Sequence, residues 1–347
     1  MSDKAKIAVD AMGGDQAPQM VIEGLAAARV LYPGVRFVIF GDEKVLRPML
    51  ASHPELEAAS DLVHTDERVT SDCKPSQALR RGRQSSMGLA LQAVKDGEAD
   101  VAISAGNTGA LMALAKFILR TMPGIERPAL VAPVPTLRGE SVMLDLGANV
   151  ECDTRNLVEF AVMGAAYART VLGLSRPTVA LLNVGVEELK GKETLREAAD
   201  ILKQATHIPM EFVGFTEGDA IGAGAVDVVV ADGFTGNIAL KTAEGTARFM
   251  GELLRRAFGS SLFAKIGYLF ARRGLRQLRE HLDPNNHNGG VFLGLNGLVV
   301  KSHGGASAEG FKTAVVTAID MVEADLIRLI SADLPDVPGH EEEAGAA

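Results

Sequence analysis

KIAVDAMGGD (6–15) shows the pattern that decides the fold: a short apolar run stops on an aspartate and then on a pair of glycines. The same arrangement recurs along the chain. Further examples are RFVIFGD (36–42), ADVAISAGNTG (99–109), SVMLDLGAN (141–149), TVALLNVG (178–185), MEFVGFTEG (210–218), VDVVVADGFTGN (226–237) and GLVVKSHGGAS (297–307). Short apolar runs bounded by turn residues are typical of buried β-strands. The sequence therefore predicts parallel strands that feed glycine-rich turns at the carboxyl edge of a sheet.

Stretches with a helical pattern separate these strands. They cover 18–31, 43–51, 76–95, 108–121, 153–173 and 193–205, and turn residues mark most of their ends. Strands that alternate with helices predict an α/β fold, in which helices sandwich a mostly parallel sheet. Free backbone N–H groups at the glycine turns, together with the helix dipoles, favour an anion there. An α/β enzyme that handles an anion is the first interpretation.

The pattern changes after Asn237, where a helical run over about 238–282 precedes the loop DPNNHNGG (283–290) and a return to strand. A last helix is expected over about 306–332. We therefore expect one catalytic α/β domain over 1–333, with a helical projection at 241–288. The acidic, Pro- and Gly-containing residues 334–347 predict a disordered tail.

Composition and charge exclude several classes of protein. Of the 347 residues, 47% are hydrophobic and the formal net charge is −9, which indicates a globular chain and disfavours electrostatic nucleic-acid binding. The cysteines, Cys73 and Cys152, lie in unlike contexts, so neither a disulfide framework nor a cysteine-rich zinc site is expected, and a cytoplasmic setting fits. Because no apolar run reaches the roughly 18 residues that span a bilayer, membrane contact is expected to be peripheral.

The glycine turns supply the first candidate ligand contacts. Asp10 ends the first apolar run, and Gly13 and Gly14 allow the backbone to approach a ligand closely. In SAGNTG (104–109), Asn107 and Thr108 lie just before a strongly helical segment, where backbone amides can bind a phosphate. Plain βα turns with good helix caps explain the same residues, so the two interpretations stay open.

Three side chains near later turns are candidates for chemistry on an oxygen anion. Lys190, in NVGVEELKGKE (183–193), can bring an ammonium inward or remain solvated, and Asn237, in ADGFTGN (231–237), offers an amide donor or a helix cap. His303 can contact substrate or begin a capped helix. No P-loop, complete dinucleotide fingerprint, serine-hydrolase elbow or zinc-protease motif occurs. If acyl transfer takes place, we expect bound inorganic phosphate to be the nucleophile.

Several of these motifs also carry a resemblance. KIAVDAMGGD, SAGNTGALM, LLNVG with a following KG, ADGFTGN and a late HG occur in the order seen in the phosphate acyltransferases of bacterial phospholipid synthesis, the PlsX family. The match runs from about residue 6 to 330. The resemblance implies transfer of a fatty acyl group from acyl carrier protein to inorganic phosphate, without cofactor or metal. It also implies a fold like isocitrate and isopropylmalate dehydrogenases and like phosphotransacetylase.

The resemblance assigns catalysis to Lys190 of the KG loop and Asn237 of GFTGN. Weaker candidates for lining the substrate and phosphate pocket are Asp10, Gly13, Gly14, Asn107, Thr108, Asn149 and His303. One departure is visible, since Val186 stands where the family commonly has threonine. A hydroxyl at position 186 is therefore not needed for the mechanism.

The predicted helical projection contains a basic amphipathic segment within 258–280. Leu262, Phe263 and Ile266 fall on one apolar face, and positive charge follows at Arg272, Arg273 and Arg276. Such a segment suits an anionic membrane surface or an acidic protein, and a dimer or core helix explains it as well. The family resemblance implies a homodimer at the inner face of the cell membrane, with acyl carrier protein as donor and handover of acyl phosphate to glycerol-3-phosphate acyltransferase.

Two alternatives come from other functional classes. A dehydrogenase or a short-chain phosphotransacetylase can share the α/β frame. Binding of NAD or NADP tests for the dehydrogenase, and use of acetyl-CoA as a substrate tests for the phosphotransacetylase. A non-catalytic membrane adaptor can use the amphipathic segment, but it has no need for Lys190 and Asn237 beside glycine turns.

Overall fold

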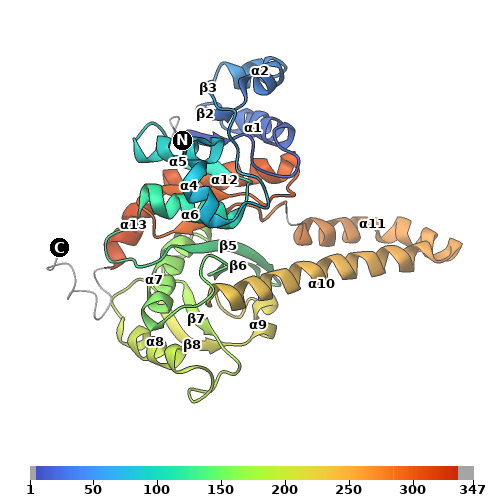
Figure 1. Cartoon of the computed structure of the whole chain (residues 1–347). Helices are drawn as coiled ribbons and strands as arrows, with labels where there is room; N and C mark the ends of the chain where they lie inside the picture. Colours follow the sequence, from blue (N-terminus) through green and yellow to red (C-terminus); the bar gives the residue numbers. More distant parts are fainter. Residues whose placement is uncertain (1–4, 284, 335–347) are drawn as a thin grey trace.

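The fold is an α/β sandwich with a projecting helical hairpin (Figure 1). A computed structural model describes residues 5–283 and 285–334. These residues form an 11-stranded sheet in the order β3-β2-β1-β4-β11-β10-β5-β6-β9-β7-β8. The strands are β1 (Lys6–Asp10), β2 (Arg36–Gly41), β3 (Ser60–His64), β4 (Val101–Ser104), β5 (Ala129–Thr136), β6 (Gly139–Leu144), β7 (Thr178–Leu182), β8 (Glu211–Thr216), β9 (Val228–Val230), β10 (Gly290–Leu293) and β11 (Leu298–Lys301).

The sheet contains two parallel groups. One joins β3, β2, β1, β4 and β11, and the other joins β6, β9, β7 and β8. Antiparallel pairings β11–β10, β10–β5 and β5–β6 connect them, so the two groups run in opposite directions. The predicted mostly parallel α/β fold is confirmed. The prediction of a single carboxyl edge is wrong, because the strands of each parallel group end at a carboxyl edge of their own.

Helices cover both faces of this sheet. They are α1 (Gln19–Leu31), α2 (Glu43–Ala51), α3 (Pro54–Glu57), α4 (Pro75–Arg81), the 3₁₀ turn η1 (Gly82–Gln84), α5 (Ser86–Lys95), α6 (Thr108–Leu119), α7 (Thr154–Val171), α8 (Glu193–Gln204), α9 (Gly218–Ala223), α10 (Gly233–Gly259), α11 (Leu262–Leu282), α12 (Ala308–Glu323) and α13 (Leu326–Asp333). Ile7 and Val9 pack into one apolar cluster, whereas Ala8 between them packs into another. This alternation follows from the two-residue period of a strand, and it places a core on each face.

The elements that the apolar runs did not predict are informative. β5 contains two prolines, and β3 is mostly exposed, so neither has the signature of a buried strand. The single helix expected over 76–95 is divided at Gly82, and the last helix is divided at Ala324 and Asp325, where Asp325 has a left-handed backbone.

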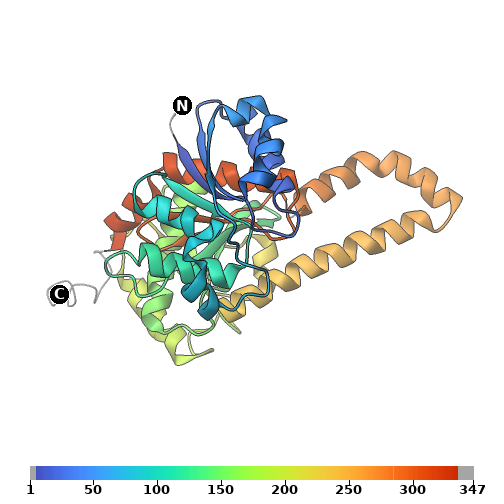
Figure 2. The same cartoon turned by 45° about the horizontal axis from the view of Figure 1, so that its top comes forward.

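Two antiparallel helices, α10 and α11, extend away from the body in both views (Figures 1 and 2). The helical run begins at Gly233, earlier than expected, and is interrupted before Leu262. The predicted disordered tail lies outside the described residues except for Leu334, which is buried in the core.

Candidate active site

The turns that follow β1, β4 and β11 meet at one end of the first parallel group. β4 lies between the other two strands, and Asp10, Ser104 and Lys301 stand in register across them. The backbone N–H of Asp15 donates to the carbonyl of Gly304 over 2.8 Å. A Cβ on Gly13 would lie 2.8 Å from the backbone nitrogen of Gly106, so this approach requires a glycine.

Asp10 organises these turns from within. Its carboxylate is 1% exposed and accepts hydrogen bonds from Ser86 Oγ at 2.6 Å, Ser104 Oγ at 2.7 Å and the Met12 N–H at 3.2 Å. Burial raises the pKa of Asp10, and these hydrogen bonds act in the opposite direction. The side chain therefore fixes the turn.

Asn107 and Thr108 lie at the start of α6. Asn107 Oδ1 accepts from the Ala110 N–H at 2.9 Å, so it is the helix N-cap, and its Nδ2 donates to the Ser71 carbonyl at 2.6 Å. The capping interpretation therefore holds for Asn107. Thr108 is the first residue of α6, where helix amides lack helical partners and favour an anion.

A second group of turns follows β6 and β9, and a buried aspartate holds it. Asp145 accepts from the N–H groups of Leu130, Ala148 and Asn149 at 2.7–3.0 Å. Asn149 is also buried, and its Nδ2 donates to the Pro128 carbonyl and to Asp145. Asn149, predicted to line the substrate pocket, is thus engaged in supporting this loop.

Asn237 differs from Asn107 and Asn149 because its amide has no hydrogen-bond partner among the described residues. It lies in the first turns of α10, whose N-cap is Asp232, which accepts from the Thr235 N–H at 2.7 Å. The helix-cap interpretation of Asn237 is therefore wrong. A Cβ on Gly147 would lie 3.5 Å from Asn237 Cγ, so this exposed amide faces the turn after β6.

Lys190 lies in the loop after β7. Its Nζ pairs with Glu187 at 2.8 Å, and its side chain is 50% exposed. The hydrogen bond and charge of Glu187 raise the pKa of Lys190, with a further contribution from Glu217. Within the described part of the chain, no hydrogen bond or ion pair joins Lys190 to Asn237. The loop does reach α10, since Lys192 Nζ lies 3.3 Å from the Asp232 carboxylate.

α10 is linked to both groups of turns. Asn237 faces the turn after β6, and the charge of Lys241 acts on both Lys301 and His303 after β11. His303 is exposed and accepts from the Gly305 N–H at 3.1 Å. Partial burial and the Lys241 charge lower the pKa of His303. α10 thus has Asn237 beside the turn after β6, and the charge of Lys241 further along it acts on His303 after β11.

Lys301 is a buried charged residue at the end of β11 that the sequence interpretation did not single out. It ends β11, and only 8% of it is exposed. Burial lowers the pKa of Lys301 to about 8, although the charges of Asp10 and Asp15 oppose this effect. The available signal was the lysine that closes the apolar run GLVVK (297–301).

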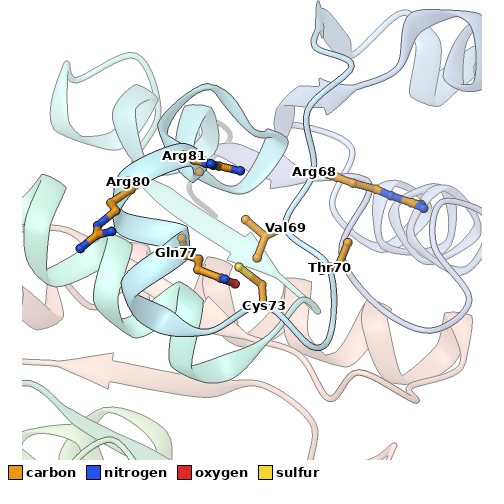
Figure 3. Close-up of a pocket in the computed structure, with 9 residues that line it drawn as sticks. Arg68, Val69, Thr70, Cys73, Gln77, Arg80 and Arg81 are labelled. Atoms are coloured by element: carbon orange, nitrogen blue, oxygen red, sulfur yellow. The ribbon is translucent and has the colours of Figure 1, made fainter.

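A cavity of about 390 Å³ lies between α4 and the segment before it (Figure 3). Val69, Cys73 and Gln77 line it, and its arginines point in different directions, so they do not form one anion site. The residues lining this cavity include none of the predicted site residues. The Ser71 carbonyl connects its wall to the side chain of Asn107.

The described residues offer one group with metal-ligand spacing, Asp42, His64 and Asp66, whose ligand atoms lie within 4.8 Å of one another. Both nitrogens of His64 already have partners, since Nδ1 accepts from the Glu43 N–H and Nε2 lies 3.4 Å from Asp66. This exposed group therefore carries no metal assignment. No helix in the described ranges is long and apolar enough to cross a membrane.

Comparisons with known proteins agree on one family. The profile of the family described as "Fatty acid synthesis protein" matches residues 5–329. A phosphate acyltransferase of Rhodopseudomonas palustris (strain BisB5) is 58% identical over 335 residues, which cover 96% of this chain and 95% of that protein. A phosphate acyltransferase of Rhodospirillum rubrum is 55% identical and covers 93% and 92% of the two chains.

Solved structures show the fold. A phosphotransacetylase from Streptococcus pyogenes superposes with a TM-score of 0.62 at 19% identity, covering 94% of this chain and 95% of the other. The EutD phosphotransacetylase from Staphylococcus aureus gives a TM-score of 0.59 at 18% identity, covering 92% and 94%. The phosphotransacetylase-like part of the fold prediction is thus confirmed.

Proposed function

The chain belongs to the fatty acid synthesis protein family that includes the phosphate acyltransferases, and is an acyltransferase; from this premise we propose that it transfers a long-chain fatty acyl group from acyl carrier protein to inorganic phosphate. A phosphate oxygen attacks the thioester carbonyl, a C–O bond forms, and the C–S bond breaks as the carrier thiolate leaves and takes a proton. The product is acyl phosphate, which is then available to a glycerol-3-phosphate acyltransferase. No covalent acyl-enzyme is required.

The observation that carries this proposal is the amide of Asn237, which lies beside the turn after β6 and has no hydrogen-bond partner in the described parts of the chain. An amide without an internal partner is available to donate to the thioester oxygen as that oxygen gains charge. Lys190, half exposed on the neighbouring loop, is proposed to neutralise charge on the phosphate and the tetrahedral intermediate. The glycine turns after β1 and β11 are proposed to hold the phosphate.

The proposed function is tested by incubating purified protein with palmitoyl-acyl carrier protein, with and without inorganic phosphate. Release of carrier thiol and formation of acyl phosphate, both dependent on phosphate, are expected by mass spectrometry. Parallel incubations with acetyl-CoA and phosphate, and with NAD or NADP, test the short-chain phosphotransacetylase and dehydrogenase alternatives. Absence of acyl phosphate with several acyl-chain lengths would overturn the proposal.

The α10–α11 hairpin is proposed to dock both the carrier and the membrane. Leu262, Phe263 and Ile266, which are 73%, 86% and 45% exposed, lie at the far end of the hairpin, where α11 begins. Exposed apolar side chains at a protruding tip suit insertion into the surface of an anionic membrane at the inner face of the cell membrane. The same three exposed side chains also suit contact with a second copy of the chain in a homodimer.

The arginines Arg272, Arg273 and Arg276 lie further along α11, between the tip and the body, and all are exposed. A positive surface at this position suits an acidic acyl carrier protein, because it brings the carrier toward Asn237 at the base of α10. The two kinds of side chain thus occupy different parts of one helix, so their roles are separable by substitution.

Reversing the charge of Arg272, Arg273 and Arg276 with glutamate is expected to raise the KM for acyl carrier protein by about tenfold or more at low salt, because attraction becomes repulsion. The dependence of that KM on salt should also weaken. The matched control reverses the exposed body residues Arg47, Arg176 and Arg328, which gives the same change in net charge. An unchanged carrier KM in the α11 variant would exclude carrier docking there.

Replacing Leu262, Phe263 and Ile266 with serine is expected to reduce sedimentation with vesicles that contain anionic lipid by about tenfold or more, because each apolar side chain contributes to insertion. Carrier KM measured without vesicles should stay near that of the unaltered chain. Sedimentation equilibrium on the same variant tests the dimer. A variant that becomes monomeric yet still binds vesicles would assign this apolar face to the dimer instead of the membrane.

A further inference from the structure

Asp10, Ser104 and Lys301 form a row across three neighbouring strands. Ser104 is in register with Asp10 on one side and with Lys301 on the other. Register partners in a parallel sheet project from the same face, so all three side chains belong to the face that carries Ala8, Ala102 and Val299. Ser104 donates to Asp10, and Lys301 completes the row at the next strand.

The Lys301 ammonium lacks an ion pair. Its hydrogen bond is to the carbonyl of the adjacent Ser302, and no carboxylate in the described residues lies within ion-pair distance of Nζ. Two strand spacings, roughly 10 Å, separate the backbones of Asp10 and Lys301. A buried charge without an opposite partner is costly, and an apolar side chain of similar length avoids that cost. The row therefore holds a cation that the fold itself does not require.

The surroundings of Lys301 identify what can neutralise it. The charges that act on Lys301 come from Asp10 on β1, Asp15 in the turn after β1 and Lys241 on α10. Lys301 ends the strand that directly precedes the turn at 303–305, and the Asp15–Gly304 hydrogen bond joins that turn to the turn at 13–15. Backbone N–H groups of glycine-rich turns beside a cationic side chain suit an oxyanion.

We propose that Lys301 binds the inorganic phosphate, and that this buried lysine at the end of β11, rather than Lys190 alone, holds the acceptor substrate. The assignment rests on the proposed acyl transfer to phosphate. Lys301 supplies a fixed charge within the body, whereas Lys190 is half exposed and paired with Glu187. A bound phosphate provides a negative partner for Nζ, which no carboxylate of the described residues provides.

The test measures phosphate binding by isothermal titration calorimetry on the unaltered chain and on Lys301→Met, which keeps the length and apolar volume but removes the charge. Loss of a charged hydrogen bond is expected to raise the Kd for inorganic phosphate by about tenfold or more. The control is Lys95→Met, an exposed lysine at the end of α5. In turnover, Lys301→Met should raise the KM for phosphate while changing the KM for acyl carrier protein by less than about twofold.

The dependence of stability on pH shows separately whether Lys301→Met is folded. Burial lowers the pKa of Lys301 to about 8 from the ordinary 10.5. Between pH of about 8 and 10.5, the Lys301 amine is therefore neutral in the native state and still protonated in the unfolded chain. Stability of the unaltered chain should therefore gain a contribution as pH rises from about 8 toward 10.5, and Lys301→Met should lack it. At pH 7 the variant should melt no lower than the unaltered chain, so weak phosphate binding would not reflect misfolding.

The unaltered chain offers a test without substitution. Above pH of about 8, free Lys301 becomes neutral, so the Kd for phosphate should rise by up to about tenfold per pH unit. Sulfate, which stays a dianion throughout, removes the titration of phosphate itself from the comparison. Asp10, Asp15, Lys241 and His303 are the other charged or titratable groups that face Lys301 or respond to it. If the trend with sulfate persists in Lys301→Met, one of those groups causes it and the proposal is overturned.

The outcomes separate this inference from the proposed function. Phosphate binding that depends on Lys301, in a chain without acyl phosphate formation, would keep the inference and overturn the function. Acyl phosphate formation with an unchanged KM and Kd for phosphate in Lys301→Met would keep the function and overturn the inference.

Discussion

Replacing Asn237 with alanine is expected to lower kcat for acyl phosphate formation by about 10²–10³ and to leave the chain folded. The rate falls because the thioester oxygen loses a donor that acts as the carbonyl becomes tetrahedral. Folding is retained because the Asn237 amide is exposed and has no hydrogen-bond partner among the described residues. The measurement is single-turnover release of carrier thiol, with the melting temperature recorded on the same preparation.

The control for Asn237 is Thr246→Ala, which removes a polar side chain from an exposed position further along α10. It should turn over as the unaltered chain does. Asn237→Asp keeps the shape but replaces the donor with a carboxylate, so it should be at least as slow as the alanine variant. Near-normal turnover in Asn237→Ala would remove this residue from the mechanism.

Lys190→Ala is expected to lower kcat by about 10²-fold, because the ammonium no longer neutralises the charge that develops during attack by phosphate. The substitution removes an exposed ion pair with Glu187, and such pairs contribute little to stability. Melting should therefore stay unchanged. Initial rates of acyl phosphate formation over a range of phosphate concentrations give kcat and KM separately.

Two companion variants show whether the Lys190 charge itself matters. Lys190→Arg keeps a cation and should recover part of the rate. Glu187→Gln frees the ammonium from its partner without removing it, so turnover should not fall. Equal loss in the alanine and arginine variants would point to the shape of the loop, and full activity in Lys190→Ala would exclude a catalytic role.

The strands and their turns were largely predictable, because they depend on local patterns. The apolar runs that end at Asp10, Ser104 and Leu182 are buried strands, as expected. β3 and β5 were missed for a physical reason. Exposed side chains on β3 and prolines in β5 remove the apolar signal, and pairing with neighbours makes these segments strands.

The motifs of the candidate site were predictable, but the hydrogen-bond partners and burial of each side chain were not. Asn107 and Asn149 are candidates for lining the pocket, and the structure adds that their amides donate to the Ser71 and Pro128 carbonyls. A polar residue at a strand end has the same sequence signature whether it faces a ligand or supports a loop. Lys301 was not singled out from the sequence, although it is buried at the end of β11, because a lysine that closes an apolar run does not by itself indicate burial.

The α/β class, the family and the motifs at the glycine turns can be read from the amino-acid sequence, because strand periodicity, turn residues and motif order are properties of neighbouring positions. Three features became visible only in the folded chain: the two parallel groups run in opposite directions, Asn237 on α10 faces the turn after β6, and Lys301 is buried without an ion pair to the described residues. Each of these depends on pairing and burial between segments far apart in the chain. The free energy of a charge or an amide is set by those surroundings and not by its neighbours in sequence.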